Sequence, residues 1–220
     1  MATKFNEVSA AEMRAAMIDS QLRTNDVIDP AVIGAMGAIA REAHVPPAFA
    51  GVAYMDRAVP LGNGRTLNAP LVTGRLLVAA MLRPGMRVLL IGAATGYTAA
   101  CLAQLGVQVH AVEEETGLLQ MAKAATAPGA IDWIEGPLAA GAPGKAPFDR
   151  IIIDGAIDAL PQTLADQLAD GGRIIAATRD GAVTRLVQGV KTGTTVALRS
   201  FADMDVAPLP GFAAAKGFRF

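Results

Sequence analysis

The feature that most constrains the fold is a regular alternation of helices and apolar strands that begins at Pro70. The run Arg87 to Ile91 ends in four apolar residues and is followed at once by glycine, which is typical of a central strand. Alternation at this spacing implies right-handed crossovers, so the sequence predicts an α/β fold with a doubly wound, mostly parallel sheet. We expect helices at about 70–81, 97–105, 116–125 and 161–168, and strands at about 87–91, 108–112, 131–134, 150–153 and 173–177.

Both ends of the chain depart from this alternation. Ser9 and Glu12 have the spacing of a capping box and predict a helix over about 10–22, while Asp29-Pro30 predicts the start of a second, short helix. An irregular stretch rich in glycine and proline follows and is a candidate wall of a cleft. Near the other end, alternation with period two in 182–190 and 195–201 predicts an antiparallel hairpin.

Composition excludes several classes of function. A chain of 220 residues, 52% of them hydrophobic, is expected to form a single domain over residues 1–220. The 19 basic and 20 acidic side chains predict no attraction to nucleic acid or to an anionic membrane. One cysteine and two histidines give neither a disulfide framework nor a metal site. Met1 to Glu7 does not look like a signal peptide and no run is long enough to span a bilayer, so we expect a cytoplasmic protein.

The strand that ends at Ile91 points to a ligand site. In open parallel sheets ligands bind beyond the carboxyl ends of the strands, where the first strand-helix turn supplies backbone N–H groups. That turn contains Gly92, Ala94 and Gly96, and Glu113 at the end of the next strand is placed to accept hydrogen bonds from a ribose. The glycines alone are equally compatible with tight packing of strand and helix, whereas Glu113 favours a nucleoside-containing ligand.

At these residues the chain resembles the protein-L-isoaspartate O-methyltransferase family. Segments similar to that family's occur in the same order over most of the chain: 14–22, 53–61, 65–70, 88–100, 148–152 and 167–173. The resemblance implies the fold of the S-adenosylmethionine-dependent methyltransferases, with 1–69 as a helical, substrate-side segment and 70–220 as a Rossmann-like core. It also implies S-adenosylmethionine as the cofactor and methyl transfer to an isoaspartyl carboxylate of a protein or peptide.

Carried over by position, the resemblance implies two sets of site residues. Asn68 and Thr66 lie in the segment that matches the family's substrate motif. Asn68 stands where the family has serine, and its amide can still donate to a carboxylate. The cofactor would be held by Gly92, Ala94, Gly96 and Glu113, and by Asp154 at the end of a later strand if it replaces a lost contact. Asp154 is equally well interpreted as the cap of a turn.

Three positions depart from the family in the cofactor site. Leu90 and Pro137 stand where the family has acids, and Ala94 replaces a glycine. Each lost acid removes a charged hydrogen bond, so these departures predict weak cofactor binding.

The sequence therefore supports an enzyme of this family and, as an alternative, a degenerate non-catalytic member that acts as a binding or scaffold protein. The oligomeric state stays open. For 208–220, which contains Phe212, Phe218 and Phe220, packing on this domain and packing on another chain are both open.

Overall fold

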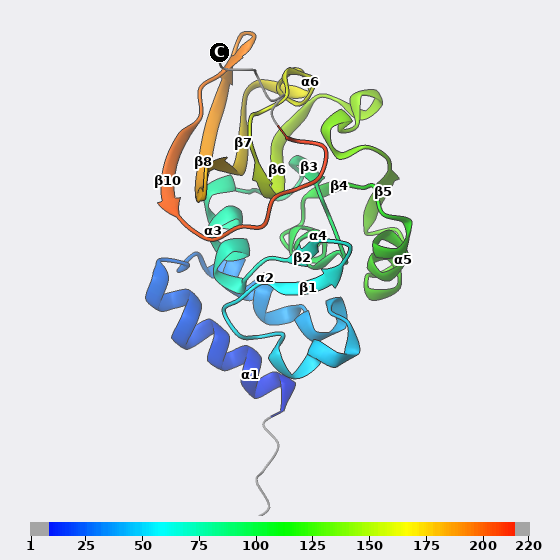
Figure 1. Cartoon of the computed structure of the whole chain (residues 1–220), viewed down its shortest axis with the longest axis vertical. Helices are drawn as coiled ribbons and strands as arrows, with labels where there is room; N and C mark the ends of the chain where they lie inside the picture. Colours follow the sequence, from blue (N-terminus) through cyan, green and yellow to red (C-terminus); the bar gives the residue numbers. More distant parts are fainter. Residues whose placement is uncertain (1–8, 214–220) are drawn as a thin grey trace, which may run out of the picture.

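A computed structural model describes residues 9–213, which are arranged around one large sheet (Figure 1). Its strand order is β10-β8-β7-β6-β3-β4-β5. The strands from β3 to β7 pair in parallel, and β8 and β10 are antiparallel to their neighbours. The predicted doubly wound, mostly parallel sheet is confirmed. The bounds are β3 (Arg87–Ile91), β4 (Gln108–Glu113), β5 (Ile131–Glu135), β6 (Phe148–Ile157), β7 (Leu168–Asp180), β8 (Val183–Thr192) and β10 (Arg199–Asp203), with β9 (Thr195–Val196) paired to β8.

The direction in which strands are added reverses at β3. The chain runs outward from β3 to β4 and β5, then returns to the other side of β3 to form β6 and β7. The carboxyl ends of β4, β3 and β6 are therefore adjacent, and this is the edge at which open α/β sheets bind ligands.

Four helices alternate with the strands of the sheet along the chain. They are α3 (Pro70–Ala80), α4 (Tyr97–Gln104), α5 (Thr116–Ala125) and α6 (Gln162–Asp166). Helix α6 is shorter than the predicted helix over 161–168, because the backbone of Gln167 and Leu168 pairs with β6. The N–H of Phe148 donates to the carbonyl of Gln167, and Leu168 pairs with Phe148 as the first residue of β7.

The helical N-terminal segment forms as its caps predict. The Ser9–Glu12 capping box is present at the start of α1 (Ala10–Ala16), which continues as a π-helix over Met17–Leu22. The Asp29 side chain accepts from the N–H groups of the first turn of α2 (Pro30–Ala38). The stretch expected to be irregular contains two 3-10 turns, Arg41–His44 and Pro47–Val52, and a small antiparallel hairpin that the sequence did not predict. The hairpin consists of β1 (Val59–Gly62) and β2 (Arg65–Leu67).

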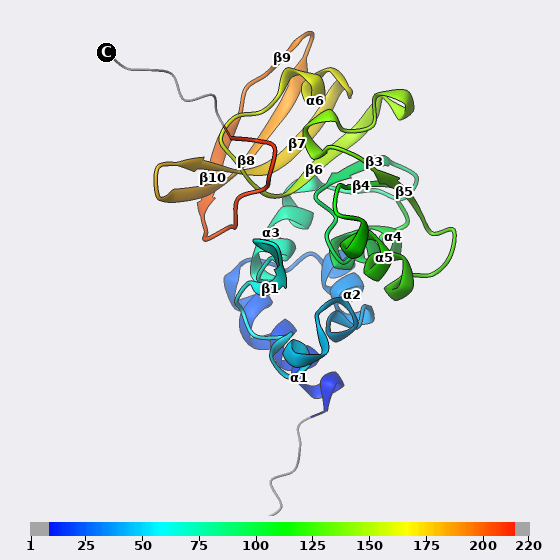
Figure 2. The same ribbon diagram turned by 45° about the vertical axis from the view of Figure 1, so that its right-hand side comes forward.

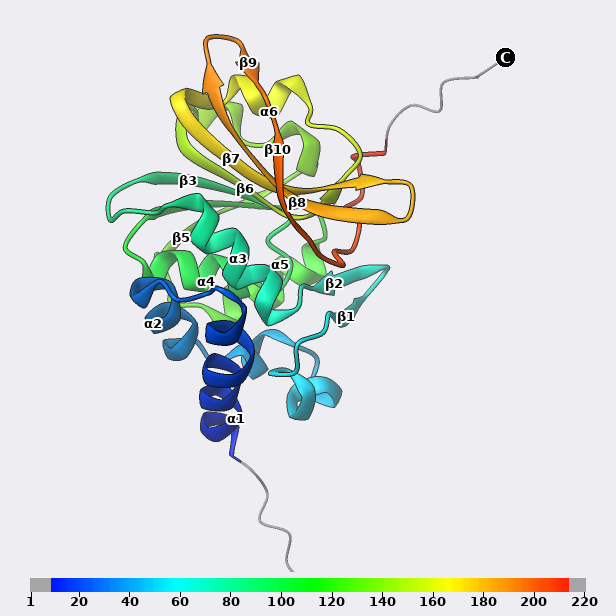
Figure 3. The same ribbon diagram turned by 90° about the vertical axis from the view of Figure 1, so that its left-hand side faces the viewer.

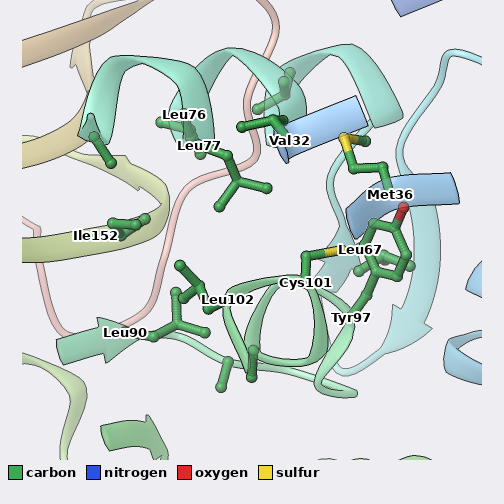
Figure 4. Close-up of a cluster of buried hydrophobic side chains, with 14 of the residues drawn as sticks. Val32, Met36, Leu67, Leu76, Leu77, Leu90, Tyr97, Cys101, Leu102 and Ile152 are labelled. Carbon is green, nitrogen blue, oxygen red and sulfur yellow. The ribbon is translucent and has the colours of Figure 1, made fainter. Parts of the chain in front are cut away.

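The two faces of the sheet bury different elements. Toward the N-terminal helices, Leu90 of β3 and Ile152 of β6 pack with α3, α4 and Met36 of α2 (Figure 4). Alternate residues, Leu89 and Ile91, face the opposite side, where the cover includes α6 and the C-terminal residues. Figure 2 shows the N-terminal helices grouped below the sheet and α6 above it. Side chains of β3 alternate between two buried faces, and Leu90 belongs to the core on the side of the N-terminal helices.

The C-terminal residues pair with the last part of β6, beyond the end of β3. Ala156 donates its N–H to the carbonyl of Ala207 and accepts from the N–H of Leu209, both at 2.9 Å. Phe212 is buried, so the part of 208–220 that the structure describes packs on this domain, while Phe218 and Phe220 lie outside the described residues. Figure 3 shows this segment, drawn in red, on the same side of the molecule as the β1–β2 hairpin. Among residues 9–213, no helix is long and apolar enough to cross a membrane.

Candidate functional site

The turn after β3 needs its glycines for two reasons. Gly92 and Gly96 have φ values of +76° and +86°, a region that side chains disfavour. A Cβ at Gly96 would also lie 3.0 Å from Ala122, and one at Gly92 would lie 3.0 Å from Leu209. Both the backbone conformation and the close packing of neighbouring side chains therefore favour glycine at these two positions. Ala94 shares the positive φ, at +49°, without being glycine.

The N–H groups of this turn are directed mainly at β4. Gly92 and Ala93 both donate to the carbonyl of Val112, at 3.0 and 3.1 Å. Ala94 donates to the carboxylate of Glu113 at 2.6 Å. The expectation that the turn offers its N–H groups to a ligand is therefore not met at these three residues, because β4 already uses them.

Glu113 ends β4 as a fully buried carboxylate paired with Arg65 of β2. Two guanidinium nitrogens of Arg65 donate to its two oxygens at 2.6 and 2.8 Å, and the two side chains are 3% and 0% exposed. Burial opposes ionisation, but the guanidinium and the N–H groups of Ala94 and Glu115 outweigh it and lower the pKa of Glu113. Glu113 is an ionised, strongly held group in the ligand-binding edge.

Asp154 lies in β6, on the other side of β3, one residue beyond Ile153, which pairs with Ile91 at the end of β3. The sequence predicted that this strand ends at 153, but β6 continues to Ile157, where Ala156 and Ile157 still pair with β7. Its two oxygens accept from Asn68 Nδ2 at 2.7 Å and from Thr98 Oγ1 at 2.5 Å. The structure thus joins Asn68 and Asp154, which the sequence assigned to separate sets. Burial raises the pKa of Asp154, since the two hydrogen bonds and the more distant charges of Arg41 and Arg65 only partly oppose it.

The backbone of Asn68 is also held in place. Arg41, a fully buried side chain, donates to the Asn68 carbonyl and to that of Ala53, and its guanidinium lies 4.7 Å from the centre of the Tyr97 ring. These contacts fix the start of α3 against the turn after β3. Asn68 therefore occupies a defined position beside Asp154.

A third element closes the β6 end of this edge. The Leu209 side chain lies over Gly155, where an added Cβ would come 2.4 Å from Leu209 Cγ, and over Gly92 in the turn after β3. An apolar side chain of the C-terminal segment thus covers the point where β3 and β6 diverge.

The other residues singled out in the sequence lie around this edge. Thr66 is half-buried in β2 and has no side-chain hydrogen bond among the described residues. Pro137 is exposed beyond β5, and Leu90 is fully buried on the helix-covered face. Leu90 therefore packs within the core, and an acid at this position would be a buried, unpaired charge.

Neither the buried histidine nor the cysteine takes part in this cluster. His44 Nδ1 lies 2.7 Å from the carbonyl of Thr95, and Thr95 Oγ1 donates back to the His44 carbonyl, which ties the turn to the N-terminal segment. Burial raises the pKa of the Cys101 thiol to about 12, so it is protonated and inert at neutral pH.

Three residues of the site were missed by sequence reasoning: Arg65, Thr98 and Leu209. Thr98 had a local signal, because it lies in the first turn of the helix after the glycines. Arg65 and Leu209 reach the site from a hairpin and a tail, and no local pattern shows where either segment folds back.

A doubly wound sheet with a glycine turn after its central strand and an acid at the next strand end defines the class of nucleoside-binding α/β proteins. Within this class, residues 12–209 match the model of the family "Protein-L-isoaspartate(D-aspartate) O-methyltransferase". The chain belongs to this family.

Relatives of known name agree with this assignment. The chain is 42% identical to a protein-L-isoaspartate O-methyltransferase of Methylorubrum populi over 74% of this chain and 77% of that protein. It is 36% identical to protein-L-isoaspartate O-methyltransferase 1 of Rhodopseudomonas palustris over 92% of this chain and 85% of that protein.

Solved structures share the fold. A protein-L-isoaspartate O-methyltransferase superimposes with a TM-score of 0.78 at 22% identity, covering 90% of this chain and 66% of that one. A Plasmodium falciparum structure assigned to the same enzymes, in complex with S-adenosyl-L-homocysteine, gives 0.76 at 20% identity over 89% and 97% of the two chains.

Proposed function

We propose that this protein is an S-adenosylmethionine-dependent methyltransferase that modifies isoaspartyl carboxylates in proteins or peptides. Family membership supports the reaction type. The observation that carries the proposal is structural: Glu113 on β4 and the Asn68–Asp154 pair on β6 flank the glycine turn after β3, so a nucleoside group and an acceptor can meet at the end of β3. We assign residues 1–69 to the substrate side, and propose a cytoplasmic protein that acts without nucleic acid or membrane.

The residues present fit the cofactor in kind. The turn at Gly92 and Gly96 has a glycine conformation, and Glu113 supplies an ionised acceptor for ribose hydroxyls. When bound, S-adenosylmethionine supplies an electrophilic methyl group. For the cofactor to enter, the side chains of Arg65 and Leu209 must move, because Arg65 is paired with Glu113 and Leu209 covers Gly92. We propose the turn, including Ala94, together with Glu113 and Asp154 as the cofactor side of the site.

The reaction makes modest demands on the protein. A carboxylate oxygen forms the new bond to the methyl carbon while the bond from sulfur to that carbon breaks, giving a methyl ester and a thioether. No proton moves, so alignment and exclusion of water suffice without a general base. We propose that Asn68, with Thr66 in the same segment, positions the acceptor.

Asp154 affects this acceptor directly. Because its carboxylate lies 2.7 Å from Asn68 Nδ2, an acceptor carboxylate placed at Asn68 meets a second negative charge when Asp154 is ionised. Asp154→Asn should therefore lower the KM for an acceptor peptide.

Methyl transfer from labelled S-adenosylmethionine to an isoaspartyl peptide tests the proposal, with the same peptide carrying ordinary aspartate as control. We expect a base-labile methyl ester on the isoaspartyl peptide alone. Asn68→Ser should raise the rate without changing the Kd for S-adenosylhomocysteine. Absence of transfer by the folded protein and by both variants would refute the methyltransferase assignment. No contact among the described residues favours the scaffold alternative.

A further inference from the structure

The hydrogen-bonding capacity of Glu113 is exhausted within the chain. Its Oε1 accepts from Arg65 Nη1 at 2.6 Å and from the N–H groups of Glu114 and Glu115 at 2.9 and 3.1 Å. Its Oε2 accepts from Arg65 Nη2 at 2.8 Å and from the N–H of Ala94 at 2.6 Å. A carboxylate offers about four lone-pair positions, and these donors already exceed them.

We propose that Arg65 competes with the ribose of an adenosyl ligand for Glu113, so that this arginine sets the affinity of the site for its cofactor. The inference rests on the proposed function. A ribose brings two hydroxyl donors and needs two acceptor positions. Three of the present donors are backbone groups of the turn and the loop after β4, which cannot leave without unfolding them. The two positions held by the Arg65 side chain are the ones that can be vacated.

The chain provides a second partner for the displaced guanidinium. Glu115 Oε1 lies 3.8 Å from Arg65 Nη1, and the Glu115 side chain is 26% exposed. Asn63, at the tip of the hairpin, donates to the other oxygen of Glu115 at 3.1 Å. Arg65 can therefore exchange Glu113 for Glu115 without being left buried and unpaired, and the exchange moves it toward solvent.

The movement is confined to one part of the hairpin. At its base, Val59 and Leu67 are a buried, paired couple in the core. The β1–β2 hairpin forms its own two-stranded sheet, and its register shifts between Pro60 and Gly62. Residues 60–66 can therefore shift while Leu67 and Asn68 stay fixed. Cofactor affinity should change independently of the acceptor position.

Calorimetry with S-adenosylhomocysteine tests the competition. We expect Arg65→Gln to bind this ligand at least about tenfold more tightly than the wild type, because two charge-assisted contacts no longer have to be broken. Arg65→Lys keeps the positive charge but loses the two parallel hydrogen bonds of the guanidinium, so its affinity for this ligand should lie between those of the wild type and Arg65→Gln. Glu113→Gln should weaken binding, and the double variant Arg65→Gln/Glu113→Gln should lose the gain.

Arg75→Gln is the matched control. Arg75 pairs with Asp26 at 3.3 Å on the outside of α3 and does not contact Glu113. The same chemical change there should leave the Kd unchanged. Thermal unfolding of every variant shows whether it is folded at the temperature of the titration.

Hydrogen exchange on the wild type gives a readout that needs no substitution. Saturating S-adenosylhomocysteine should speed exchange of the amides of residues 60–66, as Arg65→Gln does without ligand. A folded Arg65→Gln or Arg65→Lys that binds no more tightly than the wild type, or a hairpin that becomes more protected when ligand binds, would overturn the competition.

The proposed function has its own readout. If the wild type methylates an isoaspartyl peptide while Arg65→Gln gains no affinity, only the role of Arg65 is wrong. If no variant binds S-adenosylhomocysteine and no methyl ester forms, both the role of Arg65 and the methyltransferase assignment fail.

Discussion

Two strands beside β3 each carry a buried carboxylate near the level at which β3 ends, Glu113 on β4 and Asp154 on β6, and the two are held in opposite ways. Glu113 at the end of β4 is matched by a guanidinium, and its pKa is lowered. Asp154 of β6 has only an amide and a hydroxyl as hydrogen-bond partners, and burial raises its pKa. Two buried carboxylates thus have pKa values shifted in opposite directions, because a directly paired cation offsets the cost of desolvation and neutral donors do so only in part.

The two ends are also closed by different forces. A charged side chain from the β1–β2 hairpin covers β4, whereas an apolar side chain and backbone pairing from the C-terminal segment cover β6. Moving Arg65 away from Glu113 exchanges one ion pair for another, whereas moving Leu209 away from β6 removes apolar packing. Four tests probe this comparison.

The largest effect is expected at the β4 end. Arg65→Met leaves Glu113 buried without its cation and should lower the free energy of unfolding by about 3 kcal/mol, toward the lower end for a broken buried pair because three backbone donors remain. Urea unfolding at neutral pH measures it. Arg75→Met, which breaks a pair with the 90% exposed Asp26, should cost less than about 1 kcal/mol. Equal losses in both variants would mean that burial of the Arg65–Glu113 pair is irrelevant.

A packing change should disturb the β6 end next most. Gly155→Ala places a methyl group 2.4 Å from Leu209 Cγ, and the backbone of the Leu209 segment is held by its hydrogen bonds to Ala156. We expect a loss of about 1–3 kcal/mol by overpacking, together with faster hydrogen exchange in residues 206–212. Gly117→Ala in α5, where a Cβ meets no atom within 4 Å, should not lose stability. If Gly155→Ala is as stable as Gly117→Ala, Leu209 does not close this end.

The third test separates the two carboxylates by pH. The raised pKa of Asp154 means that the stability it contributes is lost as pH rises from its ordinary value of 3.8 through the raised value. Glu113, with a lowered pKa, contributes stability above its ordinary value of 4.5 and loses it as pH falls through the lowered value. Asp154→Asn should therefore remove a loss of stability that occurs as pH rises above 3.8. Glu113→Gln should remove a loss of stability that occurs as pH falls below 4.5.

Urea unfolding between about pH 3 and pH 7 measures both slopes. At neutral pH, Asp154→Asn should change stability by no more than about 1 kcal/mol, since it removes a buried charge without a cationic partner. If the free energy of unfolding depends on pH in the same way in both variants, the two carboxylates do not differ in charge pairing.

The smallest effect is expected between the two ends. Ala94 adopts a φ of +49°, which is unfavourable for a residue with a Cβ. Ala94→Gly should raise the free energy of unfolding by about 0.5 kcal/mol, because relief of the unfavourable φ outweighs the greater entropy of glycine in the unfolded chain. A slightly higher melting temperature measures this gain. Ala99→Gly, inside α4, should have the opposite sign. A loss at Ala94 as large as that at Ala99 would mean that the turn is not strained.

Local patterns determined much of this protein. The capping box at Ser9, the Asp29-Pro30 start of α2 and the alternation from Pro70 onward each act within a few residues, so the sequence was sufficient to predict the sheet and most of its helices. The end of β4 at Glu113 followed from the same pattern, whereas β6 extends to Ile157 and so passes Asp154, where the sequence predicted a strand end. Their roles toward a ligand remain predictions.

Tertiary structure alone decided how those strand ends are occupied. Arg65 reaches Glu113 across 48 residues of chain, and Asn68 reaches Asp154 across 86. Leu209 arrives from the far end of the described chain. No local propensity encodes such pairings, because they arise where independent elements pack and a buried charge requires whichever partner the fold brings to it. The sequence thus specified the acids, and packing specified that one would be paired with a cation and the other not.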